Sequence, residues 1–337
     1  MTDNNGGNYR QVTVMGAGAW GTAFAMILAD AGNQVRLWAR RPEIARAIEV
    51  TRCNPGYLRG VRLPDSVTAV SDPGDALADA EAVVLAVPSQ QLRANLAQWD
   101  IPTGTDVVSL AKGVEVGTLQ TMSQVMEASG IDHGRILAVS GPNLADEIAA
   151  KQPATTVVAG NDSAAAERFG AACRTAYFRP YTSTDLLGCE IAGATKNAIA
   201  LAVGMAMGRG FGANSMASLM TRGLAETSRL GESLGADPHT FAGLAGMGDL
   251  VATCMSPLSR NRTFGEHLGR GLNVEEAAEV SRGIAEGVRS SASILQLAER
   301  QDVEMPIVER VVRVLGGKIE PEEAIRSLMA RETKPER

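Results

Sequence analysis

One lysine interrupts a run of small and apolar residues, GCEIAGATKNAIALAVGM, which spans residues 188–205. On a helix, its neighbours three and four positions away are Ala192, Gly193, Ile199 and Ala200. A helix that is apolar on all sides is usually buried, so the Lys196 amine would lose hydration and its charged form would be disfavoured. Such a group suits the transfer of a proton near neutral pH. A lysine that extends to solvent, or one held in a structural ion pair, fits the same pattern.

A second stretch, residues 243–265, places polar groups in glycine-rich and apolar surroundings. Asp249 lies in its apolar part, where a buried carboxylate needs a cationic partner, and Lys196 is a candidate for that partner. A hydroxyl, two guanidinium groups and an amide follow on what we expect to be one loop: Ser259, Arg260, Asn261 and Arg262. These groups suit a phosphate ester as ligand. A polar surface loop without a ligand is the alternative interpretation.

The glycine pattern GAGAWG begins at residue 16, after the apolar run QVTVM and before a helical run. In this context Gly16 permits a tight turn, Gly18 lets the backbone approach a pyrophosphate, and Gly21 lets the helix pack near the strand. The N–H groups at the helix N-terminus would bind the anion. A tight turn without a ligand is the simpler alternative.

Two arginines follow the second expected strand, in the segment LWARRPE. An NAD site usually has an acidic residue there to hold the ribose 2′-hydroxyl. Arg40 and Arg41 would instead bind a 2′-phosphate through paired hydrogen bonds. We therefore expect NADP(H) to be preferred, with NAD(H) possible, unless the two arginines are only solvated.

Further candidates follow the later strands, at the carboxyl edge where open α/β sheets bind ligands. Lys112 comes after the fifth strand and is well placed to meet a substrate. After the sixth strand, Gly141 and Pro142 form a turn, and Asn143 would either cap the next helix or contact a ligand.

The elements that must position these residues change character near residue 184. Seven β-type runs precede it, separated mostly by helical runs: residues 11–15, 34–38, 66–70, 81–87, 106–110, 136–140 and 154–160. After it, apolar residues recur only at helical spacing, as in the runs 274–281, 287–300, 305–315 and 321–330. We expect an α/β protein with a Rossmann-type doubly wound parallel sheet in residues 1–183, which bind the dinucleotide. Residues 184–337 would form an all-α domain that binds the substrate.

Composition narrows the choice of partners. Of 337 residues, 45% are hydrophobic and 21% charged, which is typical of a soluble globular protein, and the net charge of −6 without a basic block argues against nucleic acid. No uncharged apolar run of membrane-spanning length and no leader are expected. The four cysteines lack metal-type spacing and indicate reduced thiols in the cytoplasm. The three histidines form no motif, and we expect no metal.

With these stretches in hand, the chain closely resembles the bacterial NAD(P)-dependent glycerol-3-phosphate dehydrogenases. The match covers nearly the whole chain in order, through GAGAWGTAFA, LWARR, VPSQQLR, AKGVE, SGPNLADEIA, EIAGATKNAIALAVG, GMGDLVATCMSPLSRNRTFG and AEGVRS. The resemblance implies interconversion of dihydroxyacetone phosphate and sn-glycerol 3-phosphate, the backbone precursor of phospholipids. It also makes a homodimer plausible.

The resemblance assigns roles to individual residues. It implies that Lys196 is the catalytic proton donor and acceptor, and that Lys112 contacts both cofactor and substrate. Around the glycerol phosphate it places Gly141, Asn143, Asp249, Ser259, Arg260 and Asn261. Around the cofactor it places Gly16, Gly18, Ala19, Trp20, Gly21, Arg40, Arg41, Ala145, Arg260, Ile284 and Glu286.

Three departures from the family pattern stand out. The family usually has Ser at Ala19 and Ser or Thr at Asn143, and it has an aromatic or small residue followed by Thr at Arg289 and Ser290. These departures put individual contacts in doubt. Two other functions stay open: a dehydrogenase acting on another small hydroxy acid or sugar acid, and a cofactor-sensing protein without turnover.

Overall fold

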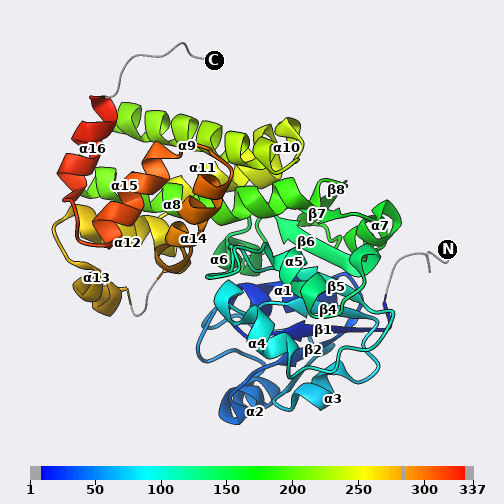
Figure 1. The fold of residues 1–337 in the computed structure, drawn as a ribbon. Coiled ribbons are helices and arrows are strands. Elements are labelled where there is room, and N and C mark those ends of the chain that lie inside the picture. The colour runs from blue at the N-terminus through cyan, green and yellow to red at the C-terminus, as the bar shows by residue number, and fades with distance from the viewer. Residues whose placement is uncertain (1–8, 282–284, 331–337) are drawn as a thin grey trace. The chain divides into compact units, whose positions relative to one another are not determined.

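The computed structural model describes residues 9–281 and 285–330, whose backbone forms two compact units (Figure 1). The first unit takes residues 9–115 and 120–190, and the second takes residues 116–119, 191–281 and 285–330. All strands of the described residues belong to the first unit, and the second is helical. The expected fold class is confirmed. The division of function between residues 1–183 and 184–337 stays a prediction.

Eight strands form one sheet, in the order β3-β2-β1-β4-β5-β6-β7-β8. Their bounds are β1 Gln11–Met15, β2 Gln34–Trp38, β3 Val67–Val70, β4 Ala82–Leu85, β5 Asp106–Ser109, β6 Ile136–Ser140, β7 Ala154–Gly160 and β8 Phe178–Ser183. The seven expected strands are therefore confirmed. The strand order reverses beside β1, which pairs with both β2 and β4, and ligands of such sheets bind at that reversal.

The sheet differs from the expected one at its far end. β7 runs antiparallel to β6, so the sheet is mixed, and β8 then pairs in parallel with β7. The sequence analysis missed β8, which contains Pro180. A proline cannot donate to a strand ladder, but it is tolerated on an edge strand, and β8 is the edge.

Helices cover both faces of this sheet (Figure 1). On one face, Val12 and Val14 of β1 join the core cluster that contains Phe24 and Phe169. That face carries α1 Ala19–Asp30, α2 Pro42–Thr51, α6 Ala145–Ala149 and α7 Ser163–Ala172. On the other face the Thr13 hydroxyl donates to the Ala76 carbonyl at 2.6 Å. That face carries α3 Pro73–Leu77, α4 Leu92–Leu96 and α5 Met122–Ala128; the short turns η1 Ser89–Gln91 and η2 His133–Arg135 complete the unit.

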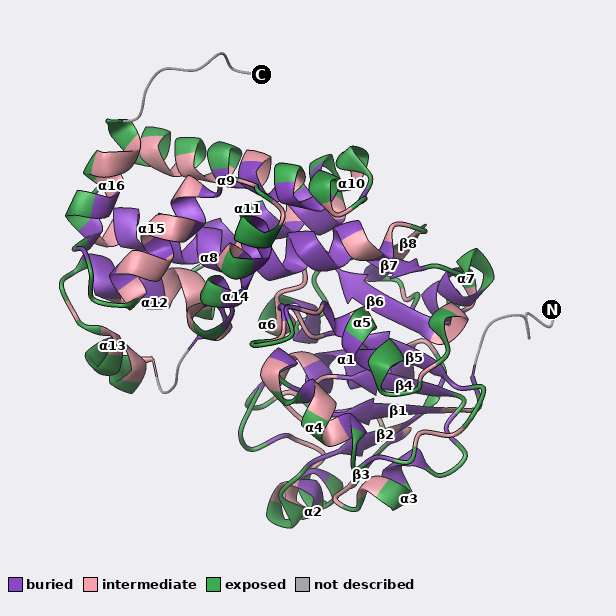
Figure 2. Cartoon of the chain, viewed as in Figure 1, coloured by how far each residue is buried: buried purple, intermediate pink, exposed green. Residues whose placement is uncertain are grey.

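The second unit is built around one long helix, α8. The helices are α8 Leu186–Gly208, α9 Ala213–Ser233, α10 Pro238–Ala242, η3 Leu244–Gly248, α11 Asp249–Met255, α12 Arg260–Gly269, α13 Val274–Val280, α14 Glu286–Arg300, α15 Pro306–Leu315 and α16 Pro321–Met329. By length and composition α8 would suffice to cross a membrane, but 94% of its most apolar window is buried inside the protein (Figure 2). It has the burial of a core helix.

Glycines bring α8 and α12 into direct backbone contact. A Cβ atom on Gly265 would lie 2.2 Å from the Leu201 carbonyl oxygen, and one on Gly269 would lie 2.2 Å from that of Met205. From the other side, a Cβ on Gly204 would lie 2.0 Å from the Arg262 carbonyl oxygen. At these contacts the residue numbers increase in the same direction along both helices, so α8 and α12 run parallel. We call this contact the glycine seam.

Candidate active site

The glycine turn has the geometry that its sequence predicts. Gly16 follows β1 with φ of +134°, which L side chains rarely adopt, and its N–H donates to the Trp38 carbonyl at 3.2 Å. A Cβ on Gly21 would lie 1.9 Å from the Gly16 carbonyl oxygen, so only glycine lets α1 pack this close to β1. The first and third glycines are thus required by the fold itself.

Gly18 differs from these two. A Cβ at this position would meet no atom within 4 Å, and its backbone is extended at φ −75°. Gly18 is also the N-cap of α1, and no side chain of the described residues caps that helix end. The N–H groups of the first turn therefore face space that a phosphate can occupy, which fits a pyrophosphate. Ala19 is the first residue of α1, and Trp20 packs its ring edge-on against Phe24, with centroids 5.3 Å apart.

The two arginines lie beside this turn. The register of β1 with β2 pairs Met15 with Trp38, so the chain after Trp38 leaves the sheet next to Gly16. Arg40 and Arg41 are both exposed there, and Arg41 lies 3.8 Å from Glu43, itself exposed. An exposed ion pair of this kind contributes little to stability, so Arg41 can exchange Glu43 for a phosphate at little cost in free energy. The position fits an adenosine ribose with a 2′-phosphate.

The remaining candidates of the first unit follow strands as expected. Lys112 is half-buried, three residues after β5. Burial of the Cys189 thiol raises its pKa to about 12, and the positive charge of Lys112 acts in the opposite direction. Gly141 follows β6 with φ of +147°, and a Cβ there would lie 3.1 Å from the Thr156 Cα. Ala145 is the first residue of α6.

Asn143 does not cap a helix, so that interpretation was wrong. Leu144 is the N-cap of α6, and the Asn143 amide nitrogen instead donates to the Thr156 hydroxyl at 2.8 Å. Thr156 in turn donates to the Ser140 carbonyl at 3.1 Å. The hydrogen bond to Thr156 of β7 takes the place of a helix cap. It leaves the Asn143 amide oxygen buried without a partner among the described residues.

In the second unit, Lys196 and Asp249 form the expected pair. The ammonium of Lys196 lies 2.5 Å from the Asp249 carboxylate, and the two side chains are 12% and 2% exposed. Lys196 also donates to the Thr253 hydroxyl at 2.9 Å, and that hydroxyl lies 3.4 Å from the same carboxylate oxygen. The sequence analysis missed Thr253. Its spacing from Asp249, one turn along α11, was the available signal.

Local backbone features hold this pair in place. Lys196 is in the middle of α8, and Asp249 is the first residue of α11, directly after the π-helical turn η3. A Cβ on Gly246, inside η3, would lie 2.1 Å from the Phe241 carbonyl oxygen, which explains one glycine of this stretch. Turns of this rare kind are frequent at functional sites.

The buried charges act on a neighbouring thiol. Burial raises the pKa of Cys254 to about 12, and the opposing charges of Lys196 and Asp249 respectively lower and raise it. Cys254 is fully buried. It is therefore a thiol at neutral pH and no candidate for a nucleophile.

The polar residues after α11 begin a helix instead of forming a loop, which corrects the expectation. Ser259 is the N-cap of α12, and its hydroxyl accepts from the Arg262 N–H at 3.3 Å. Arg262 pairs with Glu266 at 3.1 Å and is largely buried, so it is occupied within the helix. Arg260 is exposed. Asn261 donates from its amide to the Asn197 side-chain oxygen at 2.9 Å, beside Lys196.

Asn197 is a second residue that the sequence analysis missed, although it follows Lys196 directly. Glu286 is the first residue of α14 and is half-buried. Ile284 lies outside the described residues. Of the family departures, Ser290 is buried and donates to the Glu286 carbonyl at 3.1 Å, which is a structural role.

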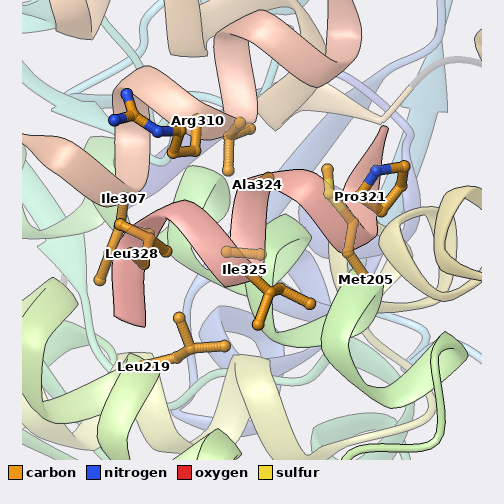
Figure 3. A pocket seen from close by; sticks show the side chains of 10 residues that line it. Met205, Leu219, Ile307, Arg310, Pro321, Ala324, Ile325 and Leu328 are labelled. Carbon is orange, nitrogen blue, oxygen red and sulfur yellow. The ribbon is translucent and has the colours of Figure 1, made fainter. Parts of the chain in front are cut away.

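One cavity of the second unit lacks reactive groups. Its walls include Met205, Leu219, Ile307 and Leu328 from four helices (Figure 3). It encloses about 290 Å³, counting open solvent at its mouth. Its only charged lining residue, Arg310, donates to Ser327 at 2.8 Å and lies 2.6 Å from a Glu309 carboxylate oxygen. Among the described residues no cluster of His, Cys, Asp and Glu side chains is arranged to hold a metal.

Comparisons with known proteins give consistent matches. Residues 11–166 match the model described as NAD-dependent glycerol-3-phosphate dehydrogenase N-terminus, and residues 185–326 match the corresponding C-terminus. A protein of Frankia casuarinae named glycerol-3-phosphate dehydrogenase [NAD(P)+] is 59% identical over 97% of this chain and 98% of its own. One of that name from Streptomyces griseus is 56% identical over the same shares. The solved glycerol-3-phosphate dehydrogenase of Coxiella burnetii superposes with a TM-score of 0.91 at 32% identity, covering 96% of this chain and 99% of that one.

Proposed function

Because the chain belongs to the NAD-dependent glycerol-3-phosphate dehydrogenase family, we propose that it interconverts dihydroxyacetone phosphate and sn-glycerol 3-phosphate with a nicotinamide cofactor. The observation that carries the proposal is the pair of Lys196 and Asp249, buried at 2.5 Å in the second unit. A buried primary amine held by a carboxylate is a proton donor with a fixed direction. A ketone reductase needs such a donor at the oxygen that becomes a hydroxyl.

The first unit supplies a place for the cofactor. The open backbone at Gly18 and the uncapped start of α1 fit a pyrophosphate, and Arg40 and Arg41 fit a 2′-phosphate. These residues support NADP(H) as the preferred cofactor, with NAD(H) also used. A bound nicotinamide of either kind supplies the hydride.

The second unit supplies the proton. As an ammonium, Lys196 protonates the alkoxide that develops when the carbonyl carbon is reduced. Asp249 favours the charged form of Lys196 and so offsets the loss of hydration. Thr253 accepts a hydrogen bond from Lys196 and limits the directions in which the amine can turn. In the reverse reaction Lys196 as a neutral amine accepts the hydroxyl proton.

The start of α12 holds the substrate phosphate in this proposal. The parallel glycine seam brings Asn261 to Asn197, the neighbour of Lys196, so the N-terminus of α12 lies beside the proton donor. A helix N-terminus, the Arg260 guanidinium and the Ser259 hydroxyl together favour a dianion. Lys112, Gly141 and Asn143 are proposed as further substrate-binding residues.

One assay tests the function. Purified protein is mixed with dihydroxyacetone phosphate and either NADPH or NADH, and the absorbance of the reduced ring is followed. Oxidation of both, faster with NADPH, is expected. Oxidation only with non-phosphorylated ketones would favour a different hydroxy-acid dehydrogenase, and binding of NADPH without turnover would favour a cofactor sensor.

Three wider statements rest on the same family membership. We expect the product to feed phospholipid synthesis, the protein to be cytoplasmic, and two copies to form a homodimer. Light scattering of the purified protein measures the last of these.

A further inference from the structure

We infer that Gly287 is a positioning residue for the substrate site, a role that rests on the proposed function. Gly287 is the second residue of α14, and its backbone N–H donates to the Asn261 amide oxygen at 2.9 Å. That N–H is one of the donors left unpaired at any helix start. Ala285, the N-cap of α14, offers no side-chain acceptor, so Asn261 satisfies this donor from another helix.

This hydrogen bond fixes which way the Asn261 amide faces. A backbone N–H needs an acceptor, so the oxygen of Asn261 must face Gly287 and its nitrogen must face Asn197. The nitrogen then donates to the Asn197 side-chain oxygen at 2.9 Å. The Asn197 amide is oriented in turn, with its own nitrogen directed away from Asn261. One backbone N–H thus sets two amides beside Lys196.

The missing side chain of Gly287 is as important as its N–H. A Cβ there would lie 2.8 Å from the Asn261 amide oxygen and 2.9 Å from the Asn197 carbonyl oxygen. Its φ does not require glycine, and alanine would favour the helix by about 1 kcal/mol. The glycine is therefore explained by the space that the two asparagines occupy.

The test compares Gly287→Ala with Gly160→Ala. Both insert a methyl group into occupied space, but a Cβ on Gly160 would lie 2.2 Å from Leu137 Cδ2, and Gly160 pairs with Leu137 at the start of β6, at the opposite edge of the sheet from Gly141. We expect Gly287→Ala to lower kcat/KM for dihydroxyacetone phosphate by about 10- to 100-fold, mostly through KM, because misplaced groups lose rate steeply. Gly160→Ala should lower the melting temperature while folded protein keeps kcat/KM within about twofold of wild type.

A double-mutant cycle separates positioning from general distortion. Once Asn261→Ala has removed the amide, α14 can shift into the vacated space, so adding Gly287→Ala should change kcat/KM less than about twofold. Equal losses in both backgrounds, or wild-type kinetics in Gly287→Ala, would overturn the inference. Absence of wild-type turnover would instead overturn the proposed function.

A second measurement applies even if Gly287→Ala does not fold. In Asn261→Ala, the Gly287 N–H loses its acceptor, so its hydrogen exchange measured by NMR should accelerate at least about tenfold. Unchanged exchange at Gly287 would show that Asn261 does not hold it, and the inference would fail.

Discussion

Lys196 and Asp249 are 53 residues apart in the sequence, yet their charged groups meet at 2.5 Å with little contact with solvent. The pair joins the middle of α8 to the first residue of α11. Removing one partner leaves the other charge buried, whereas removing both leaves a gap that apolar side chains can fill. Substitutions of the two residues separate the chemical role of the pair from its structural role.

Lys196→Ala should lower kcat by roughly two to four decades, because the proton donor is lost, while the affinity for NADPH is retained. Steady-state kinetics and a fluorescence titration of the cofactor measure both quantities. Lys151→Ala is the control, since Lys151 pairs with Asp30 on the surface. Near-normal turnover in Lys196→Ala would remove the lysine from its proposed role.

Asp249→Asn should lower the free energy of unfolding by about 3–5 kcal/mol, because the Lys196 ammonium keeps its burial and loses its counter-charge. The double variant Lys196→Met with Asp249→Leu should recover much of that loss. Urea unfolding monitored by circular dichroism supplies the numbers. A double variant less stable than Asp249→Asn would argue that the pair is itself a net source of stability.

Arg40→Asp should weaken NADPH binding at least about tenfold and change NADH binding much less, since only NADPH carries the 2′-phosphate. Dissociation constants for both cofactors measure the effect. Arg46→Asp, also exposed and on α2, makes the same charge change away from the turn and controls for long-range repulsion. An equal loss of NADPH affinity in both variants would show that Arg40 makes no specific contact with the cofactor.

Gly18→Ala and Gly21→Ala should fail in different ways. A methyl group added at Gly18 meets open space, so the protein should fold normally but bind cofactor weakly, because the methyl takes the place of the pyrophosphate. A methyl group added at Gly21 would lie 1.9 Å from the Gly16 carbonyl oxygen, so that variant should lose several kcal/mol of stability. Calorimetry with and without NADPH distinguishes the outcomes. Unchanged cofactor affinity in Gly18→Ala would count against the site.

Glu190→Gln should stabilise the protein increasingly as pH rises from 4 to 8. Burial raises the pKa of the Glu190 carboxyl, although the Ser123 hydroxyl and N–H, at 2.5 and 2.7 Å, oppose it. A carboxyl whose pKa is higher in the folded state stabilises the fold below its unfolded pKa and loses that contribution as pH rises. The stabilising effect of the substitution should therefore grow with pH. Urea unfolding across this range, with the exposed Glu167→Gln as control, detects it, and a pH-independent difference would refute it.

The sequence predicted those features that depend on local pattern. Short β-type runs that alternate with helical runs located β1 to β7, and the apolar surroundings of Lys196 and Asp249 made them candidate partners. A buried charged group needs a partner of opposite charge, so two opposite charges in apolar stretches are expected to pair with each other.

Features set by distant parts of the chain could not be predicted in this way. Nothing local shows that Asn143 bonds to Thr156 instead of its own helix, because the choice depends on how β6 meets β7. The antiparallel direction of β7 has the same origin. Likewise, the SRNR segment is polar enough for a loop, and its first helical turn is stabilised by contacts of α12 with α8.

The glycine seam has one consequence for motion. Asn197 and Asn261, Leu201 and Gly265, and Met205 and Gly269 are three contacts with the same offset of 64 residues. Sliding α12 along α8 by a single residue would drive side chains into backbone at both glycine contacts and would break the hydrogen bond between the two amides. The two helices therefore have one permitted alignment and move as one rigid body. The Lys196 amine and the Asn261 amide accordingly stay together during catalysis.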